Sequence, residues 1–332
     1  MSRAQTLHAR TADGTRPYAL PDGGVALVAF AVVLFSVYNA LTKWLAADYD
    51  PLQIVFFRGL FGLLPVALIL LWHGGGTAVL RSRRPGVQVL RAVLALAANI
   101  CFILSYRAMP LADAVAIGYA APIFVTALSV PMLSERVGVH RWSAVLVGFL
   151  GVLLVARPGV GVFEPAALLA IFGTLLYALS IIATRRLGTL DAAITTMAHS
   201  TSLYVIICAL ALPFVWVTPT WTDLAFFLAL GLVGGVGMFC FVQAYRMAEA
   251  TKLAPFDYTA MVWATIFGFA IWGEVPTLWS VAGISVIAGS GLYIVHREHV
   301  TRRTAAAQAA LAGSSSRKVP AKARSAAQSV SS

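Results

Sequence analysis

Long apolar runs constrain this chain more than any other feature of its sequence. Ten of them are long enough to cross a bilayer as a helix, which takes about 20 residues. They cover residues 24–46, 52–72, 86–107, 111–132, 139–157, 164–185, 192–216, 223–245, 251–273 and 277–296. Charged residues make up only 11% of the chain, against about a quarter in a soluble domain. We therefore predict an all-α integral membrane protein with ten transmembrane helices.

Only Ala108-Met109-Pro110 separates the third run from the fourth. A proline at this point favours a tight turn, because it cannot donate the hydrogen bond that a continuing helix needs. One helix over 86–132 would also be about twice as long as the bilayer is thick. We therefore expect two spans here.

Lysine and arginine predict the orientation of the chain. If both termini are cytoplasmic, 19 of the 24 Lys and Arg residues lie in segments on the cytoplasmic side, and only Arg107 and Arg157 lie outside. This bias agrees with the positive-inside rule. We expect a cytoplasmic tail at 1–23 and a disordered basic tail at 297–332, in a protein of the bacterial inner membrane. The net charge of +11 then reflects topology, and no nucleic-acid partner is expected.

The chain also repeats itself when it is shifted by 139 residues. The aligned pairs are Tyr38 with Tyr177, Tyr106-Arg107 with Tyr245-Arg246, Tyr119 with Tyr258, Thr126 with Thr265, and Glu135 with Glu274. Each unit, 24–157 and 164–296, holds five spans, so the second enters the membrane upside down. Transporters built from inverted repeats bind substrate near the membrane midplane, at the interface between the repeats.

The two units also resemble a known family. The first carries residues 111–124 (LADAVAIGYAAPIF), Ser134-Glu-Arg136, Arg141-Trp-Ser143 and Gly148-Phe-Leu-Gly151, and the second carries Ala254-Pro-Phe-Asp-Tyr-Thr259, Gly273-Glu274, Trp279 and Gly289-Ser-Gly291. In order and repetition they resemble the EamA family of the drug/metabolite transporter superfamily. The resemblance implies a basket of helices around a central cavity, with spans five and ten packed at the side.

Members of this family move amino acids, other metabolites or drugs, many of them outward. Phe56-Phe57-Arg58 after Pro51, together with the run from Gly118 to Pro122, also resembles the riboflavin importers, and similar strings occur in S-adenosylmethionine importers. The resemblance therefore implies amino-acid or metabolite efflux first and riboflavin-like or S-adenosylmethionine-like uptake second.

Three basic residues fall inside spans, where a charge costs about 2.5–3.5 kcal/mol on insertion scales. Arg58 has two readings: an anchor for a substrate carboxylate or phosphate, which a guanidinium binds bidentately, or a side chain that snorkels to the headgroups. Lys43 and Arg91 lie nearer the ends of their spans, and we expect both to snorkel.

Two further ionisable residues lie in the cytoplasmic halves of their spans. His199 is a candidate for substrate binding or proton relay, or a neutral histidine bonded within the bundle. Asp257 is a candidate for binding an amine or exchanging a proton, or a partner of Lys252.

Polar and aromatic side chains gather near the predicted midplane. A buried tyrosine needs a hydrogen-bond partner, so repeat-related tyrosines at one level favour a shared polar cavity over ordinary packing. The predicted substrate-binding set comprises Tyr38, Asn39, Arg58, Asn99, Tyr119, Tyr177, His199, Tyr258 and Trp263.

A proline, two glutamates and three cysteines are candidates for conformational or packing roles. Pro122 is expected to bend span four at its centre, as a static kink or as part of the site. Glu135 and Glu274 end spans four and nine, where they are candidates for pairing with arginine, as gates or as structural ion pairs. The three cysteines lie inside apolar runs and are expected to be packing residues.

The absence of certain motifs narrows the possible classes of function. The chain has no G-x-x-x-x-G-K-[ST] sequence, so no ATP hydrolysis by a P-loop is expected, and no cofactor, metal site or ATPase partner is predicted. An intramembrane enzyme would need a nucleophile–base pair or a two-ligand metal cluster, and we find neither in the sequence. A channel is the second alternative to a transporter. The leading hypothesis is a gradient- or exchange-driven transporter of a small organic metabolite, embedded in lipid as a monomer or homodimer.

Overall fold

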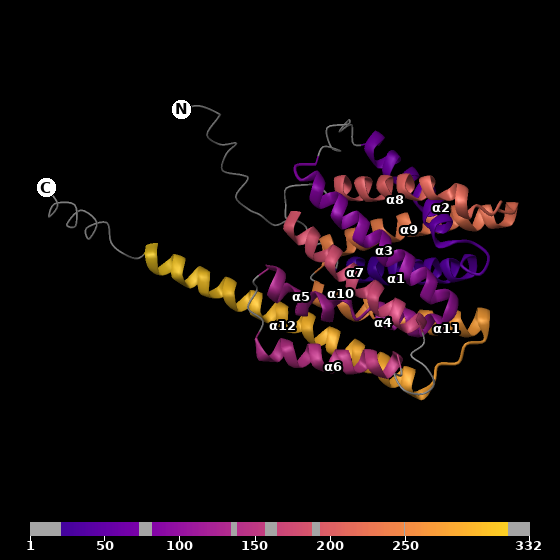
Figure 1. Cartoon of the computed structure of the whole chain (residues 1–332). Coiled ribbons are helices and arrows are strands. Elements are labelled where there is room, and N and C mark those ends of the chain that lie inside the picture. Colours follow the sequence, from indigo (N-terminus) through magenta and orange to yellow (C-terminus); the bar gives the residue numbers. More distant parts are fainter. Residues whose placement is uncertain are drawn as a thin grey trace, which may run out of the picture.

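The computed structural model describes residues 21–72, 82–133, 138–156, 165–187, 193–248 and 250–317. These residues form α-helices and no strands. The helices are α1 (Pro21–Leu45), α2 (Pro51–Trp72), α3 (Pro85–Ala108), α4 (Leu111–Gly118), α5 (Ala121–Leu133), α6 (Val139–Ala156), α7 (Pro165–Leu187), α8 (Ala193–Val215), α9 (Trp221–Met247), α10 (Ala250–Asp257), α11 (Ala260–Trp272) and α12 (Leu278–Arg317). Figure 1 shows them packed side by side in one bundle.

The predicted all-α fold is confirmed for the described residues. Eight helical segments are long and apolar enough to cross a membrane, and two shorter apolar helices, Pro51–Leu64 and Trp142–Ala156, lie where spans two and five were predicted. The predicted turn between spans three and four is present at Met109-Pro110. The Met109 N–H still bonds to the carbonyl of Ser105, and Pro110 then directs the chain into α4.

Spans four and nine each consist of two helices, which hydropathy did not predict. The first break lies at Tyr119-Ala120, between α4 and α5, and the second at Tyr258-Thr259, between α10 and α11. The bend expected at Pro122 therefore lies at Tyr119. Pro122 is the second residue of α5, where its missing N–H removes no intrahelical hydrogen bond. Tyr119 and Tyr258 are one repeat spacing apart, so the two halves share this break.

The 139-residue repeat spacing also relates the main contacts between helices. α3 packs along α7 and α1 along α9, while α2 packs on α8 and α6 on α12. When each helix is exchanged for its repeat mate 139 residues away, the α3–α7 contact becomes the α9–α1 contact, and the α2–α8 and α6–α12 contacts map onto themselves. The family-implied placement of spans five and ten is confirmed, since α6 and α12 lie together along one edge of the bundle (Figure 1).

Small residues allow the close contact between α6 and α12. A Cβ on Gly151 would lie 3.1 Å from the carbonyl oxygen of Gly283, and a Cβ on Gly283 would lie 2.8 Å from that of Gly151. Side chains at either position would push the backbones apart, so these glycines serve helix packing. The free cysteines Cys101, Cys208 and Cys240 are all buried, as expected of packing residues.

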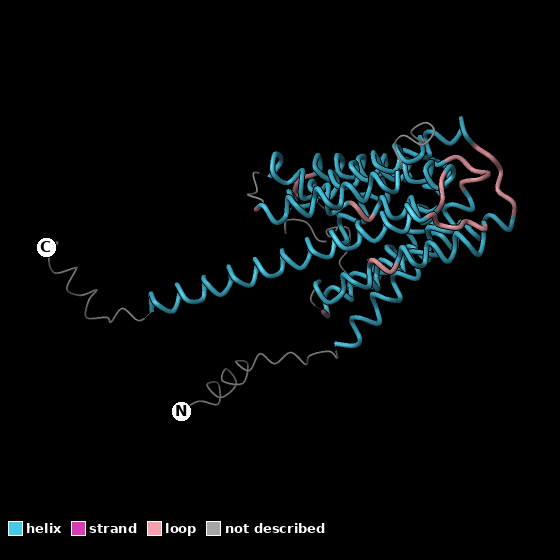
Figure 2. Tube along the Cα trace, turned by 90° about the horizontal axis from the view of Figure 1, so that it is seen from below, coloured by secondary structure: helices cyan, strands magenta, loops and turns pink. Residues whose placement is uncertain are grey.

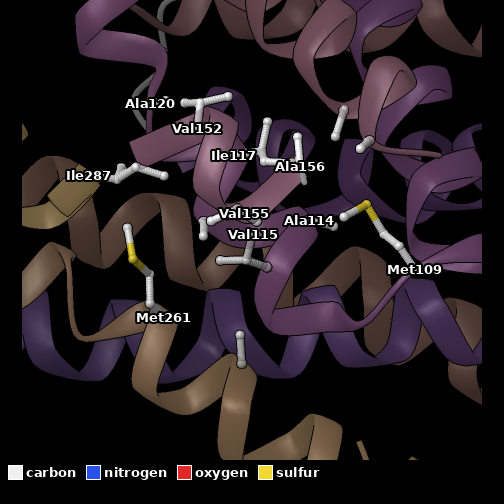
Figure 3. Packing of buried hydrophobic residues seen from close by; sticks show 14 of the residues in the cluster. Met109, Ala114, Val115, Ile117, Ala120, Val152, Val155, Ala156, Met261 and Ile287 are labelled. Carbon is white, nitrogen blue, oxygen red and sulfur yellow. The ribbon is translucent and has the colours of Figure 1, made fainter. Parts of the chain in front are cut away.

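Buried side chains from both halves of the chain form the largest apolar cluster. Met109 and Val115 lie near the turn between α3 and α4, Val152 lies on α6, and Met261 and Ile287 come from α11 and α12 (Figure 3). This cluster fixes the position of the α3–α4 turn against α11, which bears on the ion pair described below.

The predicted disorder from residue 297 onward is wrong as far as Arg317. α12 continues past the apolar run and projects beyond the rest of the bundle (Figures 1 and 2). Residues 305–312 are mostly alanine, the best helix former, so local propensity extends the helix without apolar periodicity. Residues 1–20 and 318–332 lie outside the described part of the chain.

Candidate functional site

Arg58 joins three helices inside the bundle. Its Nη1 donates to the hydroxyl of Tyr38 on α1 and to Oδ1 of Asn99 on α3, the latter at 2.9 Å. The guanidinium carbon lies 5.7 Å from the centroid of the Tyr38 ring. The next residue, Gly59, lets α2 approach α8, because a Cβ there would lie 2.8 Å from Cγ2 of Val205. The Arg58 side chain therefore points into the interior of the helix bundle and does not extend toward the headgroups.

Arg91 also points between helices, so the prediction that it snorkels is wrong. Its Nε donates to Oγ1 of Thr184 on α7 at 2.7 Å, and its Nη1 donates to Oγ of Ser200 on α8. No pattern in the chain indicates these contacts, because Thr184 and Ser200 belong to no motif and lie 93 and 109 positions from Arg91. The structure thus adds Arg91 to the candidate site.

Two tyrosines lie near these arginines. Tyr204 of α8 is within electrostatic range of both Arg58 and Arg91, and Tyr177 of α7 is within that range of Arg91 and of Tyr119. Tyr177 is 46% exposed although it lies in the middle of its helix. Because its charged and polar neighbours come from α3 and α4, we interpret this exposed surface as facing the space between helices.

Neither guanidinium has an acidic partner. In the part of the chain that the structure describes, no carboxylate oxygen lies within 4.0 Å of Arg58 or Arg91. Their hydrogen-bond partners are neutral hydroxyl and amide groups. The interior between α2, α3, α7 and α8 is therefore positively charged.

A second polar cluster surrounds the break between α10 and α11. Oδ2 of Asp257 accepts a hydrogen bond from the hydroxyl of Tyr245, while its buried Oδ1 has no hydrogen-bond partner among the described residues. The rings of Tyr258 and Tyr119 lie next to it, with centroids 5.6 Å apart. The alternative that Asp257 pairs with Lys252 is wrong: Lys252 is exposed on the first turns of α10, and Tyr245 on α9 is the partner.

An ion pair joins helices at one end of the bundle. Nζ of Lys43 donates to Oε1 of Glu274 and to the carbonyl oxygen of Met109, the latter at 2.7 Å. Oε2 of Glu274 accepts from the backbone N–H of Leu111 at 2.8 Å. Lys43 is only 8% exposed, so the prediction that it snorkels is wrong, and the partner of Glu274 is this lysine and not an arginine.

This ion pair, which we call the Lys43–Glu274 latch, joins α1, the α3–α4 turn and the segment between α11 and α12. A cavity of about 460 Å³ lies beside it, lined by residues that include Tyr106, Arg107 and Trp272. The two charged residues are 231 positions apart, so only the tertiary structure brings them together. Glu135, the repeat-related glutamate, lies outside the described residues.

The other predicted site residues make more local contacts. Nδ1 of His199 donates to the carbonyl of Thr195 in its own helix at 2.8 Å, so this ring nitrogen is bonded within α8. Oδ1 of Asn39 lies 3.5 Å from the hydroxyl of Tyr106, and Trp263 stacks on Phe267 of the same helix. The structure thus groups Tyr38, Arg58 and Asn99 in one cluster and Tyr119, Asp257 and Tyr258 in another.

The sequence model of the EamA-like transporter family matches residues 22–157 and 164–296. The chain belongs to this family. EamA proteins form part of the drug/metabolite transporter superfamily, so the bundle is that of a multi-pass membrane transporter.

Named relatives of this EamA chain differ in what they carry. An S-adenosylmethionine uptake transporter of Rickettsia bellii is 25% identical, over 86% of this chain and 97% of the relative. A riboflavin transporter of Rhizobium johnstonii is 27% identical, over 83% and 91%. A pseudopaline exporter of Pseudomonas aeruginosa is 28% identical, over 80% and 93%.

A solved crystal structure shares the fold of this EamA chain. It aligns with a TM-score of 0.58 at 18% identity, covering 85% of this chain and 99% of the other. At this level of identity the likeness concerns the fold alone.

Proposed function

We propose that this EamA protein is a secondary transporter that moves a small organic metabolite across the bacterial inner membrane by alternating access. In this proposal the two five-helix units enter the membrane in opposite orientations and rock against each other. The observation that carries it is the matched packing of α3 on α7 and of α1 on α9, with Tyr119 and Tyr258 in contact between the units. Inverted repeats of this kind bind substrate at their interface.

The substrate path runs through the two polar clusters. Arg58, Tyr38 and Asn99 present donors and an aromatic face on one side, and Asp257 with its free carboxylate oxygen lies on the other. The Lys43–Glu274 latch seals the end of the path that the charge bias places outside the cell. The half-exposed Tyr177 is consistent with a path that is open from the inside.

The first candidate for the transported solute is an amino acid or related metabolite moving outward. The second is uptake of a solute such as S-adenosylmethionine or riboflavin, which the names and nearly full-length alignments of two relatives favour. A pseudopaline exporter among the relatives supports the outward direction. Asp257 is the proposed proton-coupling residue, with His199 the lesser candidate because its ring is bonded to its own helix.

A reconstitution experiment tests the proposal. The purified protein is placed in liposomes, and uptake and exchange of radiolabelled amino acids, flavins, nucleosides, polyamines and S-adenosylmethionine are followed, with empty liposomes as the control. We expect saturable flux and counterflow of at least one solute, and the vesicle side that must hold unlabelled solute reports direction. Absence of flux across the panel contradicts transport, and unitary ion conductance in a planar bilayer supports a channel instead.

A further inference from the structure

Two arginine side chains, Arg58 of α2 and Arg91 of α3, contact neighbouring helices inside the bundle. Arg58 bonds to Asn99 on α3, and Arg91 precedes Asn99 on that helix by eight residues. Eight residues correspond to about 12 Å of α-helix, or roughly two turns. Asn99, which holds the Arg58 guanidinium, and the backbone of Arg91 therefore lie about two turns apart along α3.

Each guanidinium is held in place by neutral groups and keeps donors for a ligand. Arg58 uses Nη1 for Tyr38 and Asn99, and Arg91 uses Nε and Nη1 for Thr184 and Ser200. A guanidinium has five N–H donors, so Nη2 of both arginines is left over among the hydrogen bonds of the described residues. Hydrogen bonds that the arginines donate to side chains on neighbouring helices fix both orientations, which lowers the entropic cost of binding an anion.

Two unpaired positive charges are costly in the membrane-spanning part of a protein. No carboxylate of the described chain lies within 4.0 Å of either group, as noted above. Asp257, the acidic residue of the other cluster, is engaged by Tyr245. A ligand that brings negative charge to both arginines would remove this cost, whereas a cationic ligand would increase it.

Tyr204 of α8 is a further polar residue near the two arginines. It lies within electrostatic range of both, and its phenol is a further donor for an acidic oxygen. Tyr177 of α7, within electrostatic range of Arg91, is 46% exposed. Together these residues place hydrogen-bond donors on α2, α3, α7 and α8.

We infer that Arg58 and Arg91 bind the two ends of one substrate that carries two acidic groups, carboxylate or phosphate, separated by a short chain. The inference rests on the proposed transport function, because it identifies the solute class of that same path. A solute with a single acidic group engages one arginine and leaves the other unpaired. The spacing along α3 thus selects for a second acidic group at the far end of the molecule.

Binding to the purified full-length protein in detergent tests the inference without any need for transport. The probes are succinate, adipate and suberate, the monocarboxylates and diamides of matching length, inorganic phosphate, and 3-phosphoglycerate. Thermal shift and titration calorimetry report affinity, since a ligand stabilises the state it binds. We expect one diacid or the phosphate–carboxylate compound to bind at least about tenfold more tightly than its monoacid, because charge-assisted hydrogen bonds at the second arginine are lost in the monoacid.

Variants assign the effect to the two arginines. Arg58→Gln and Arg91→Gln should each reduce diacid affinity to about that of the monoacid. Arg91→Lys keeps the charge without the planar fork and should give an intermediate affinity. Arg246→Gln is the matched control, because Arg246 is an exposed arginine near the end of α9, and it should bind like the wild type. Gel filtration and circular dichroism check folding; where Arg91→Gln fails to fold, Arg91→Lys and Arg58→Gln carry the test.

Three results would overturn the inference: a diamide that binds as well as its diacid, diacid affinity unchanged in a folded Arg91 variant, or no binding of any acidic probe. The outcome stays distinct from that of the proposed function. Flux of a neutral or cationic solute without diacid binding would end the inference and leave transport standing. Diacid binding without flux of any solute would do the reverse.

Discussion

Tyr119 and Tyr258 occupy equivalent positions in the two repeats, and their rings lie with centroids 5.6 Å apart. Each follows the first short helix of a broken span, and each begins the turn before the second. Two residues related by a two-fold axis contact each other only where they lie beside that axis. The pair therefore marks where the proposed axis in the membrane plane passes through the bundle.

The proposed topology predicts which residues can be labelled from each side of the membrane. In a background with the three native cysteines replaced by serine, Ser2→Cys and Ser332→Cys should react with a membrane-impermeant maleimide only after the cells are opened. Asp48→Cys, in the exposed turn between α1 and α2, should react in intact cells. Opposite-side labelling of the two termini would contradict an even number of spans and with it the inverted repeat.

Arg58→Ala is expected to reduce transport at least about tenfold while the protein stays folded, because the substrate loses a bidentate anchor but the neutral partners Tyr38 and Asn99 can bond to water or to each other. Initial rates in liposomes measure the effect, and gel filtration reports folding. Arg246→Ala serves as the control at an exposed arginine. A wild-type rate in a folded Arg58→Ala protein would remove Arg58 from the substrate site.

Breaking the Lys43–Glu274 latch is expected to destabilise the protein. Glu274→Gln removes the charged bond to Lys43 and should lower the free energy of unfolding by about 1.5–3 kcal/mol, the usual value for a hydrogen bond to a charged group. Unfolding in sodium dodecyl sulfate measures this change. A double-mutant cycle with Lys43→Met isolates the pair, and Asp48→Asn controls for loss of an exposed carboxylate. Additive effects in the cycle would mean that the two residues are not coupled.

Asp257→Asn separates proton coupling from solute binding. If Asp257 takes up and releases the coupling proton, the variant should lose flux driven by an imposed pH gradient and keep solute exchange, because exchange needs no net proton movement. Both rates are measured in the same liposomes, and Asp48→Asn provides the control. Undiminished pH-driven flux in Asp257→Asn would assign coupling to another group, and His199→Gln is the next variant to measure.

The turn between α1 and α2 gives a pH dependence of stability. Burial and the hydrogen bond to Asp223 raise the pKa of Tyr49 above its usual value of 10.0. The folded protein thus holds this proton more tightly than the unfolded chain does. Its contribution to stability is complete below about pH 10 and is lost as the pH rises through the raised pKa.

Tyr49→Phe should therefore lower the free energy of unfolding by about 1 kcal/mol at neutral pH, the usual worth of one hydrogen bond. It should also remove part of the decline in stability above pH 10. Unfolding curves between pH 7 and 11 measure both effects, with Tyr293→Phe as the control at an exposed tyrosine. A decline identical to that of the wild type would show that Tyr49 does not contribute to it.

Hydropathy predicted the order and the approximate ends of the helical segments, because transmembrane helices must be long and apolar wherever they pack. It did not predict the breaks at Tyr119 and Tyr258, since a one-turn interruption leaves a run as apolar as before. It also assigned Lys43 and Arg91 to the headgroups. Whether a long basic side chain extends to the headgroups or turns inward depends on the neighbours it meets, here Glu274 for Lys43, and Thr184 and Ser200 for Arg91.

The amino-acid sequence alone determined that the chain is helical, lies in a membrane and repeats itself, because apolar length, charge bias and residue spacing are properties of the linear chain. The tertiary structure decided which polar groups meet. Arg58 and Asn99 are 41 positions apart and Lys43 and Glu274 are 231 apart, and such contacts follow from how the helices pack and rotate against each other. Hydrogen bonds and ion pairs act over a few ångströms, so no pattern in the chain predicts them until the fold has brought their atoms together.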